Sequence, residues 1–424
     1  MIRLIETRNF RSLKYISQPL DNFHVLVGAN ASGKTTFLDA IKFISDLVKN
    51  GVDYAITERT ENYLDLTFGR QGGDIELAVE LEMPEAISSR YAEKKHHRIR
   101  YEVRIGLAPE TQEHTIREER VLLLKTEAID GTNGHKDRMD FPDGSLRETL
   151  VVRKPFARNT FSLLLSKGED ERDVFYPETL AVQEKHLRYR FYFGAKKSAL
   201  GNMPADNTLF PSAMWLKNFL EEGVRLFFIE GAHMRKASPP GQSKQFSTDG
   251  SNLPWVVEDL KRKHKDHFRD WIKHIRTALP DVKDIITVER ADDKHRYLKM
   301  LYNNGMEIPG WMVSDGTLRL LALTLPAYLP DFKGVYLIEE PENGIHPLAI
   351  ETVYQSLASV YDAQILVATH SPVLLSLLKP AQVLCFAKTE DGTTDIVRGD
   401  EHPVLKNWNG QPDLSILFAG GVFS

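Results

Sequence analysis

The stretch VLVGANASGKTTF, residues Val25 to Phe37, decides how the rest of this chain is interpreted. It contains the pattern G-x-x-x-x-G-K-[ST], in which backbone N–H groups surround phosphates, a lysine reaches the outer phosphates and a hydroxyl holds magnesium. The residues that match the pattern are Gly28, Gly33, Lys34 and Thr35. Glycines let the backbone curl and approach a ligand closely, and lysine supplies a compact positive charge. The stretch therefore indicates a phosphate-binding loop.

The segments on either side of this loop have the order that a nucleotide site requires. Phe23 to Val27 is apolar and β-branched, which predicts a strand, and Thr35 to Val48 carries apolar residues at helical spacing. This order aims the positive end of a helix at the anion. A chance match in a glycine-containing loop is the alternative, and the flanking strand and helix argue against it. The residues expected to bind the nucleotide here are Gly28, Asn30, Ser32, Gly33, Lys34, Thr35 and Thr36.

Composition limits the class of protein. A chain of 424 residues with 42% hydrophobic residues has room for two or three domains with real cores. The net charge of −5 means that any nucleic-acid partner must be met by a local basic patch. The single cysteine, Cys385, excludes an internal disulfide and a cysteine zinc cluster, and it fits a reducing compartment. The charged start MIRLIETRNF and the lack of a long apolar run predict a cytoplasmic protein without a membrane partner.

Two adjacent carboxylates predict the hydrolytic part of the site. Gly334 to Ile338 is an apolar run that predicts a buried strand, and Glu339 and Glu340 follow it. Acids at the end of an apolar strand are costly to bury, so they are normally there to hold a cation and to orient a nucleophile. We expect Glu339 to hold magnesium, directly or through water, and Glu340 to polarise the attacking water. An ordinary strand end with solvated acids is the alternative.

Two further segments add anion-binding chemistry. Ser314 and Gly316 precede a helix that we expect to begin near Leu318, and a serine at a helix N-terminus can bind an anion. His370 follows the apolar run Gln364 to Thr369, and a histidine there can hydrogen-bond a γ-phosphate. Taken singly, each has an ordinary structural explanation: Ser314 and Gly316 as a helix cap, and His370 as a structural histidine.

Two other residues are weaker candidates. Gln71 lies just before an alternating strand pattern, where it could contact metal or attacking water, although a turn glutamine without a role explains it equally well. Arg11 is close to the phosphate loop in sequence, and it is either a phosphate contact or a surface arginine beside a hairpin.

The remaining patterns predict an antiparallel layer and a less regular lobe. Alternating apolar residues recur between residues 75 and 124, whereas regular signals weaken from about residue 126 to residue 250. A single long amphipathic helix is expected from Asn252 to Pro280. Basic residues mixed with aromatic residues at 188–197, and a basic run at 94–100, could contact DNA, although solvated faces explain them too.

The order of these motifs resembles the ATP-binding-cassette ATPase superfamily. More narrowly it resembles the branch containing RecF, SMC-type heads and OLD-family ATPases, because of IRLIETRNFRS, IEEPENGIHP and ATHSP. The resemblance covers about residues 1–85 and 305–375. It implies an α/β P-loop NTPase with an antiparallel β layer and an inserted mixed or helical lobe. The implied division is an N-terminal ATPase part at 1–128, an inserted lobe at 129–248 and a C-terminal ATPase part at 249–424.

The resemblance also implies roles for the residues named above. ATP and Mg²⁺ would be bound, with Lys34, Glu340 and His370 catalytic and with Thr35, Glu339 and Gln71 at the metal. Ser314 and Gly316 would contact ATP held by a second subunit, and the loop from Glu342 to Pro347 would cross that interface. Three positions depart from the usual pattern: Glu339 stands where aspartate is commoner, and Asp315 and Thr317 replace the usual glycine and glutamine or glutamate.

The function that follows is an ATPase that dimerises around ATP and acts as a switch. The resemblance implies a nucleic-acid-related process, either DNA repair or antiviral defence, with a separate effector such as a nuclease. The segment after His370 is too short for a nuclease domain of its own. The alternatives are an ATP-dependent scaffold that does not hydrolyse and a transporter ATPase subunit.

Overall fold

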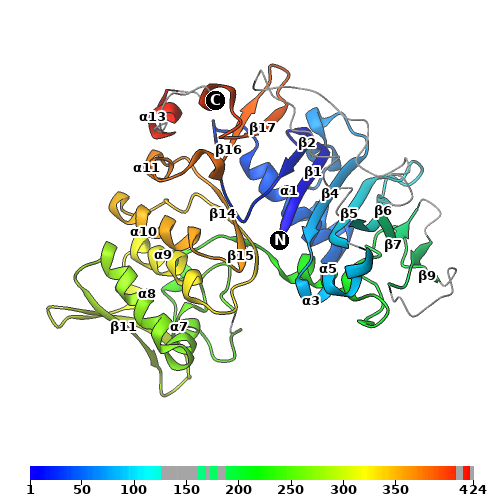
Figure 1. Ribbon diagram of the computed structural model, residues 1–424. Coiled ribbons are helices and arrows are strands. Elements are labelled where there is room, and N and C mark those ends of the chain that lie inside the picture. The colour runs from blue at the N-terminus through cyan, green and yellow to red at the C-terminus, as the bar shows by residue number, and fades with distance from the viewer. Residues whose placement is uncertain are drawn as a thin grey trace.

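The computed structural model describes residues 1–94, 96–125, 141, 161–168, 172–178, 188–243, 245–406 and 414–420. These residues form a parallel-type sheet, a large antiparallel sheet and a small third sheet, with helices between and around them (Figure 1). Apart from Phe141, the loop predicted at residues 131–145 lies outside the described residues. Within those ranges, no helix has the length and apolar character needed to cross a bilayer.

The central sheet has the strand order β10-β14-β15-β3-β16-β17 and is parallel except for the β16–β17 pair. Its strands are β3 (Phe23–Gly28), β10 (Val224–Phe227), β14 (Gly334–Glu339), β15 (Ala363–Ala368), β16 (Val383–Lys388) and β17 (Thr394–Arg398). Their runs of valine, leucine and isoleucine suit strands that are covered on both faces. The predicted strands at the phosphate loop, before the paired glutamates and before His370 are confirmed, and β3, β15 and β14 are neighbours in the sheet.

The second sheet is antiparallel, with the strand order β2-β1-β4-β5-β6-β7-β8-β9. Its strands are β1 (Ile2–Phe10), β2 (Leu13–Pro19), β4 (Ile75–Glu82), β5 (His96–Leu107), β6 (His114–Lys125), β7 (Phe161–Lys167), β8 (Asp173–Phe175) and β9 (Tyr189–Phe191). Helix α1 (Lys34–Asn50) shares one apolar core with residues of both sheets. The α/β class and the antiparallel layer are therefore confirmed.

Short helices join or follow the strands of the two large sheets. They are α2 (Val52–Thr57), η1 (Tyr63–Leu66), η2 (Phe68–Arg70), α3 (Glu85–Ser88), η3 (Ser89–Lys94), α11 (Pro372–Ser376), η6 (Pro380–Gln382), α12 (Pro403–Lys406) and α13 (Leu414–Ala419). Helix α5 (Pro211–Glu222) packs its apolar side chains into the same core as α1.

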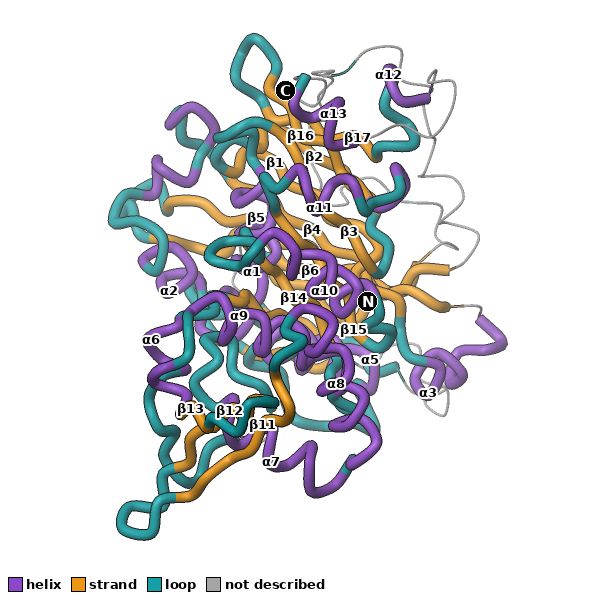
Figure 2. The backbone as a smooth tube through the Cα atoms, turned by 90° about the vertical axis from the view of Figure 1, so that its left-hand side faces the viewer, coloured by secondary structure: helices purple, strands orange, loops and turns teal. Residues whose placement is uncertain are grey.

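A second core lies under a cluster of helices and the small sheet, which Figure 2 shows at the end of the molecule away from the C-terminus. These helices and the small sheet are α6 (Gly231–Met234), α7 (Leu253–Lys263), α8 (Lys265–Ala278), β11 (Val282–Glu289), β12 (Arg296–Tyr302), β13 (Glu307–Pro309), η4 (Gly310–Met312), α9 (Asp315–Thr324), η5 (Leu325–Tyr328) and α10 (Pro347–Ala358). We call this part the helical lobe. It includes helix α9, which follows Ser314.

The single helix expected from Asn252 to Pro280 is wrong, because the structure has two helices. The chain leaves helical geometry at His264, where φ is −130° and ψ is 63°. The bend lets α7 pack on β11 and β12 while α8 packs on α9 and α10. Trp271 of α8 is fully buried and its Nε1 donates to Thr324 Oγ1 of α9 at 3.0 Å. Apolar periodicity continues through the bend, and for that reason the sequence pattern does not show it.

The range 129–248, expected as an inserted lobe, contributes to both large sheets in its described parts. Strands β7, β8 and β9 extend the antiparallel sheet, and β10 pairs with β14 in the central sheet. The expected domain boundaries themselves stay a prediction. Three strands in this range, β8, β9 and β10, have only three or four residues, which are too few to establish a sequence pattern.

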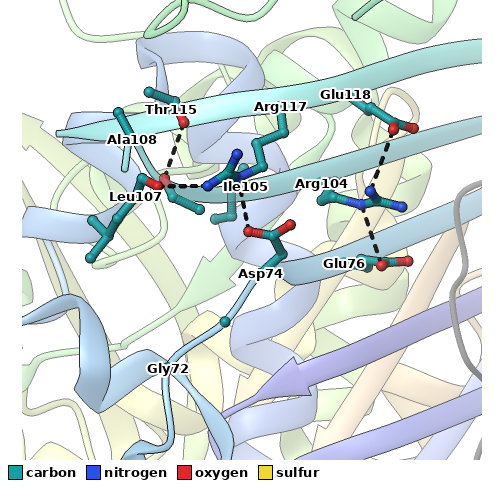
Figure 3. A network of polar contacts seen from close by, with 12 residues as sticks. Gly72, Asp74, Glu76, Arg104, Ile105, Leu107, Ala108, Thr115, Arg117 and Glu118 are labelled. Atoms are coloured by element: carbon teal, nitrogen blue, oxygen red, sulfur yellow. Dashed lines mark hydrogen bonds and ion pairs between the residues drawn. The ribbon is translucent and has the colours of Figure 1, made fainter. Parts of the chain in front are cut away.

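The antiparallel sheet carries buried ion pairs across neighbouring strands. Arg104 of β5 lies 3.3 Å from Glu76 of β4 and 3.4 Å from Glu118 of β6 (Figure 3). At the end of the same sheet, Arg117 Nε lies 2.9 Å from Asp74 Oδ1 and its Nη2 donates to the Leu107 carbonyl at 2.7 Å. Because charges buried together need such pairing, these contacts fix the register of β4, β5 and β6. They also fix the strand end that follows the Gln71 turn.

Candidate nucleotide site

The phosphate loop joins β3 to α1, and its glycines are required by close neighbours. Gly28 has φ +152° and Gly33 has φ +107°. A Cβ at Gly28 would lie 2.2 Å from the Phe386 carbonyl oxygen, and a Cβ at Gly33 would lie 2.4 Å from Thr394 Oγ1. Strands β16 and β17 therefore press against the loop, and a larger residue at either glycine would displace it.

Hydrogen bonds of Thr394 hold the outside of the phosphate loop, and the sequence did not predict them. Thr394 Oγ1 lies 2.9 Å from the Ser32 carbonyl oxygen and 3.0 Å from Ser12 Oγ, and the Thr394 N–H donates to the Ser12 carbonyl at 3.0 Å. The contact joins segments far apart in sequence, so no local pattern reveals it. On the loop itself, Asn30 is exposed, while the buried Ser32 hydroxyl makes no hydrogen bond within the described part of the chain. That hydroxyl is available to a ligand.

Lys34 is buried and folds back on the loop that it is expected to serve. Its Nζ donates to the carbonyl oxygens of Gly28 and Ala29, each at 2.9 Å. Burial lowers the pKa of the Lys34 ammonium to about 8, against the opposing attraction of Glu340 and Glu339. A phosphate that replaced the two carbonyls would offer this cation a full negative charge.

Thr35 and Glu339 come together at the carboxyl edge of the central sheet. Burial raises the pKa of Glu339, interaction with the nearby Thr35 hydroxyl opposes that shift, and Glu340 and Asp39 raise the pKa further. A hydroxyl and a carboxylate are the hard oxygen donors that Mg²⁺ prefers, so this pair fits the predicted metal. Among the described residues no group of three or more His, Cys, Asp or Glu side chains could hold a metal.

Glu340 has an unusual backbone conformation beside this pair. Its φ is +44°, its N–H donates to the Ala368 carbonyl at 2.8 Å, and its Oε2 accepts from the side-chain amide of Asn343. A non-glycine residue in this region costs about 1–3 kcal/mol and persists where the surrounding structure requires it, often at functional sites. The Glu340 carboxylate is exposed at this position.

Glu342 connects the loop after the paired glutamates with the histidine segment, and the sequence analysis had assigned it no role at the nucleotide. Its Oε1 accepts from Thr369 Oγ1 at 2.6 Å and from the His370 N–H at 3.0 Å. Its Oε2 is buried and has no hydrogen-bond partner within the described residues. Glu342 therefore fixes the position of the half-buried His370. The acidic residue two positions beyond Glu340 is visible in the sequence, but its pairing with the residues that follow β15 is not.

The two weaker candidates, Arg11 and Gln71, differ in their contacts. Arg11 Nη1 pairs with Asp39 Oδ2 at 2.9 Å. Asp39 lies on α1, the helix that follows the phosphate loop, and it also pairs with Arg59 at 2.6 Å. Arg11 is thus bound to a carboxylate one turn after Thr35. Gln71 is exposed on the turn after η2, where Asn9 Nδ2 donates to the neighbouring Gly72 carbonyl at 3.0 Å. The described contacts do not bring Gln71 to Thr35 or Glu339, so its metal role stays a prediction.

Ser314 and Gly316 stand at the start of α9, which begins three residues before the expected Leu318. Ser314 is the N-cap, and its Oγ accepts from the Thr317 N–H at 3.2 Å. A Cβ at Gly316 would lie 2.2 Å from the Gly344 carbonyl oxygen, so the helix start packs directly on the loop after Glu342. Asp315 is held by Arg235 at 3.0 Å. The exposed Ser314 hydroxyl and the helix N-terminus face solvent, available to another molecule.

Some residues of the predicted basic segments already interact with other residues of the chain. Lys196 pairs with Asp53 at 3.3 Å and with Glu113 at 3.1 Å. Phe191 and Phe193 stack on each other, with ring centroids 5.7 Å apart. In the basic run at 94–100, the side chains of residues 94–96 lie outside the described set. DNA contact through these segments stays a prediction.

The phosphate loop and the central sheet around it define a protein with the P-loop NTPase fold. The family AAA_21, described as "AAA domain, putative AbiEii toxin, Type IV TA system", matches residues 23–376. This range contains the phosphate loop, the paired glutamates and His370. The chain belongs to this family. No curated protein matches the sequence.

Similar solved structures are heads of SMC proteins. An Smc head bound to the C-terminal winged-helix domain of ScpA has 14% identity, a TM-score of 0.49, and coverage of 93% of this chain and 97% of that chain. An Smc head from Pyrococcus furiosus, bound to the C-terminal domain of ScpA, has 13% identity, a TM-score of 0.47 and coverage of 93% and 95%. The SMC head domain from Thermotoga maritima has 10% identity, a TM-score of 0.41 and coverage of 94% and 98%. Scores of this size indicate a distant likeness only.

The lowered pKa of Lys34 predicts a pH-dependent nucleotide affinity. Phosphates attract only the protonated lysine, and the ligand-free ammonium loses its proton as pH rises through about 8. Affinity for fluorescently labelled ATP should therefore fall above that pH, approaching about tenfold per pH unit. A titration series of the wild type tests this, with Lys34→Met as the control that should bind weakly and without this dependence. A wild-type affinity that stays constant well above pH 8 would contradict the assignment.

The contacts of Glu342 predict that its role is geometric. Glu342→Ala removes the acceptor for Thr369 and for the His370 N–H, and misplacing His370 should slow ATP turnover about 10–100-fold with ATP affinity nearly unchanged. Glu342→Gln keeps an Oε1 acceptor for both donors and should retain most of the turnover. Steady-state turnover and ATP binding, measured on both variants, check this. A glutamine variant as slow as the alanine variant would show that the negative charge, not the positioning, matters.

Proposed function

We propose that this protein binds ATP with Mg²⁺, hydrolyses it and uses the nucleotide to control association of two copies of the chain. One observation carries the proposal: Thr35 and Glu339 meet beside the phosphate loop, with Glu340 next in the chain. A phosphate loop alone would support nucleotide binding. The paired acids add groups that can handle a metal and a water.

In the proposed reaction, the loop N–H groups and Lys34 would hold the β- and γ-phosphates. Bound Mg²⁺ would neutralise developing charge, and the oxygens of Thr35 and Glu339 are the protein groups placed to hold it. Glu340 would orient and polarise the water that attacks the γ-phosphorus, while the leaving oxygen is that of ADP. His370, positioned by Glu342, would donate a hydrogen bond to the γ-phosphate and lose that contact after cleavage.

A second copy would complete the site through Ser314 and the N-terminus of α9. These groups face solvent in a single chain, and Gly316 rests on the loop that follows the catalytic glutamates. If ATP contacts both copies, it binds the paired state better than the separated state, and hydrolysis removes that preference. The nucleotide would then act as a timed switch, and its output would depend on a separate effector.

The biological setting that we propose is antiviral defence or DNA repair. The family description refers to a toxin of a type IV toxin–antitoxin system, which favours defence. The motif order that resembles RecF, SMC heads and OLD-family ATPases favours a process on nucleic acid. Adding double-stranded DNA to the ATPase assay separates direct DNA engagement, which should stimulate turnover, from a switch that is read by a partner protein.

A scaffold that binds ATP without hydrolysing it is the second candidate. The ordered, strained placement of Glu340 favours turnover, whereas the departures at Asp315 and Thr317 favour a slow enzyme. A transporter subunit is the less favoured reading, because the opening strands and the large antiparallel sheet resemble the RecF and SMC branch.

The substitution Glu340→Gln separates hydrolysis from binding. It removes the base while keeping the size of the side chain, so turnover should fall by at least about 100-fold while ATP binding remains. ATP should then hold the variant as a dimer in light-scattering chromatography. Lys34→Ala is the matched control and should lose binding, turnover and dimer together. If Glu340→Gln hydrolyses ATP at the wild-type rate, the assigned mechanism is wrong.

A further inference from the structure

A cavity of about 660 Å³ lies away from the nucleotide site, at the amino ends of β10 and β14. The strand β14 has 6 residues and carries Glu339 at its other end. At about 3.3 Å per residue, the two ends of this strand lie roughly 16 Å apart. The cavity is therefore separate from the phosphate loop. We call it the seam pocket, and its volume is within the usual range for a small-molecule site.

The seam pocket lies where the two apolar cores meet. One wall is α5, with Trp215, Asn218 and Phe219, and α5 packs with α1 beside the phosphate loop. The opposite wall is α7, with Val256 and Leu260, whose side chains belong to the core of the helical lobe. A ligand in this cavity would contact both parts of the molecule at once.

The interior of the seam pocket suits a flat ring. Phe332 and Tyr336 stack with ring centroids 3.7 Å apart and planes at 13°, and both are almost fully buried. Trp215 and Phe219, on the α5 wall, lie 5.5 Å apart. The Tyr336 hydroxyl donates to the Lys333 carbonyl at 3.1 Å, so the polar end of that ring is already satisfied. Aromatic walls of this kind favour a planar aromatic guest.

The charged residues around the cavity indicate the sign of the ligand's charge. Arg225 donates to the Glu222 carbonyl and to the side-chain oxygen of Gln245, which are both neutral acceptors. Within the described parts of the chain no ion pair joins Arg225 or Lys333 to a carboxylate. Lys263, in contrast, is paired with Asp259 at 2.8 Å. A guanidinium without a carboxylate partner is suited to bind a planar anion.

The acidic members of the lining limit how negative that ligand can be. The carboxylates of Glu222 and Asp331 also line the cavity. They would repel a polyanion such as ATP while leaving a single negative charge tolerable beside Arg225. This charge pattern distinguishes the seam pocket from the nucleotide site.

We propose that the seam pocket binds a planar aromatic small molecule with one negative charge, and that its occupancy regulates the ATPase. The route to the active site is short. α7 is followed directly by α8, and Trp271 of α8 is hydrogen-bonded to Thr324 of α9, the helix that Ser314 caps. A ligand that changes the spacing of α5 and α7 would therefore act on the C-terminal end of α9, the helix whose other end carries Ser314. This regulatory part rests on the proposed ATPase function, whereas binding does not.

The first test is a titration of the full-length protein with the fluorescent probe anilinonaphthalene sulfonate, an aromatic monoanion. We expect saturable binding at one site, which Lys34→Ala retains and which excess ATP does not abolish. Arg225→Gln removes the cation and should weaken binding by about tenfold or more. Asn218→Trp, at an exposed position of the α5 wall, should block the cavity even if the Arg225 variant folds poorly.

Lys273→Gln is the matched control, since Lys273 is an exposed lysine of α8 outside the cavity and pairs with Asp270. This control should bind the probe like the wild type. Equal affinity in the wild type, Arg225→Gln and Asn218→Trp would overturn the proposed site, as would loss of probe binding in Lys34→Ala. If the probe binds as expected but saturating probe leaves ATP turnover unchanged, the regulatory role is overturned while the site remains.

Discussion

The whole site depends on one constraint, which is that parallel strands end at the same edge of a sheet. Because β3, β15 and β14 are neighbours and run in the same direction, the phosphate loop, His370 and the paired glutamates are brought to one place. The proximity of Thr35 to Glu339 is the direct result. Everything else in the molecule supports this edge, completes it or responds to it.

Support comes from parts of the chain that are distant in sequence. The C-terminal strands β16 and β17 pack so closely on the loop that Gly28 and Gly33 have no room for a side chain. Thr394 and Ser12 hold the loop from outside, and Glu342 holds His370 from the neighbouring loop. Close packing and hydrogen bonds therefore hold the loop from several sides, and backbone carbonyls of Gly28 and Ala29 bind its lysine. Binding of phosphate would therefore require mainly a movement of the Lys34 side chain.

Much of this could be predicted from local sequence, and the limits have physical causes. The β3 strand, the loop and helix α1 were predictable because each motif carries its own glycine and apolar pattern, and the same holds for Glu339 and Glu340 after β14. The bend at His264 was missed because apolar periodicity runs through it. Thr394 and the partners of Glu342 were missed because tertiary pairing alone brings them to the loop. The seam pocket was invisible for the same reason, since its walls come from separate cores.

The most direct test of the central claim is complementation between two inactive variants. Lys34→Ala disables the phosphate loop, and Ser314→Arg blocks the start of α9. If one ATP is completed by two copies, a mixture of the two proteins contains a heterodimer with one intact site, formed by the loop of one chain and the α9 start of the other. The account predicts that mixing restores ATP hydrolysis that neither variant shows alone. Hydrolysis that stays at the level of the separate variants would contradict a site shared between two copies.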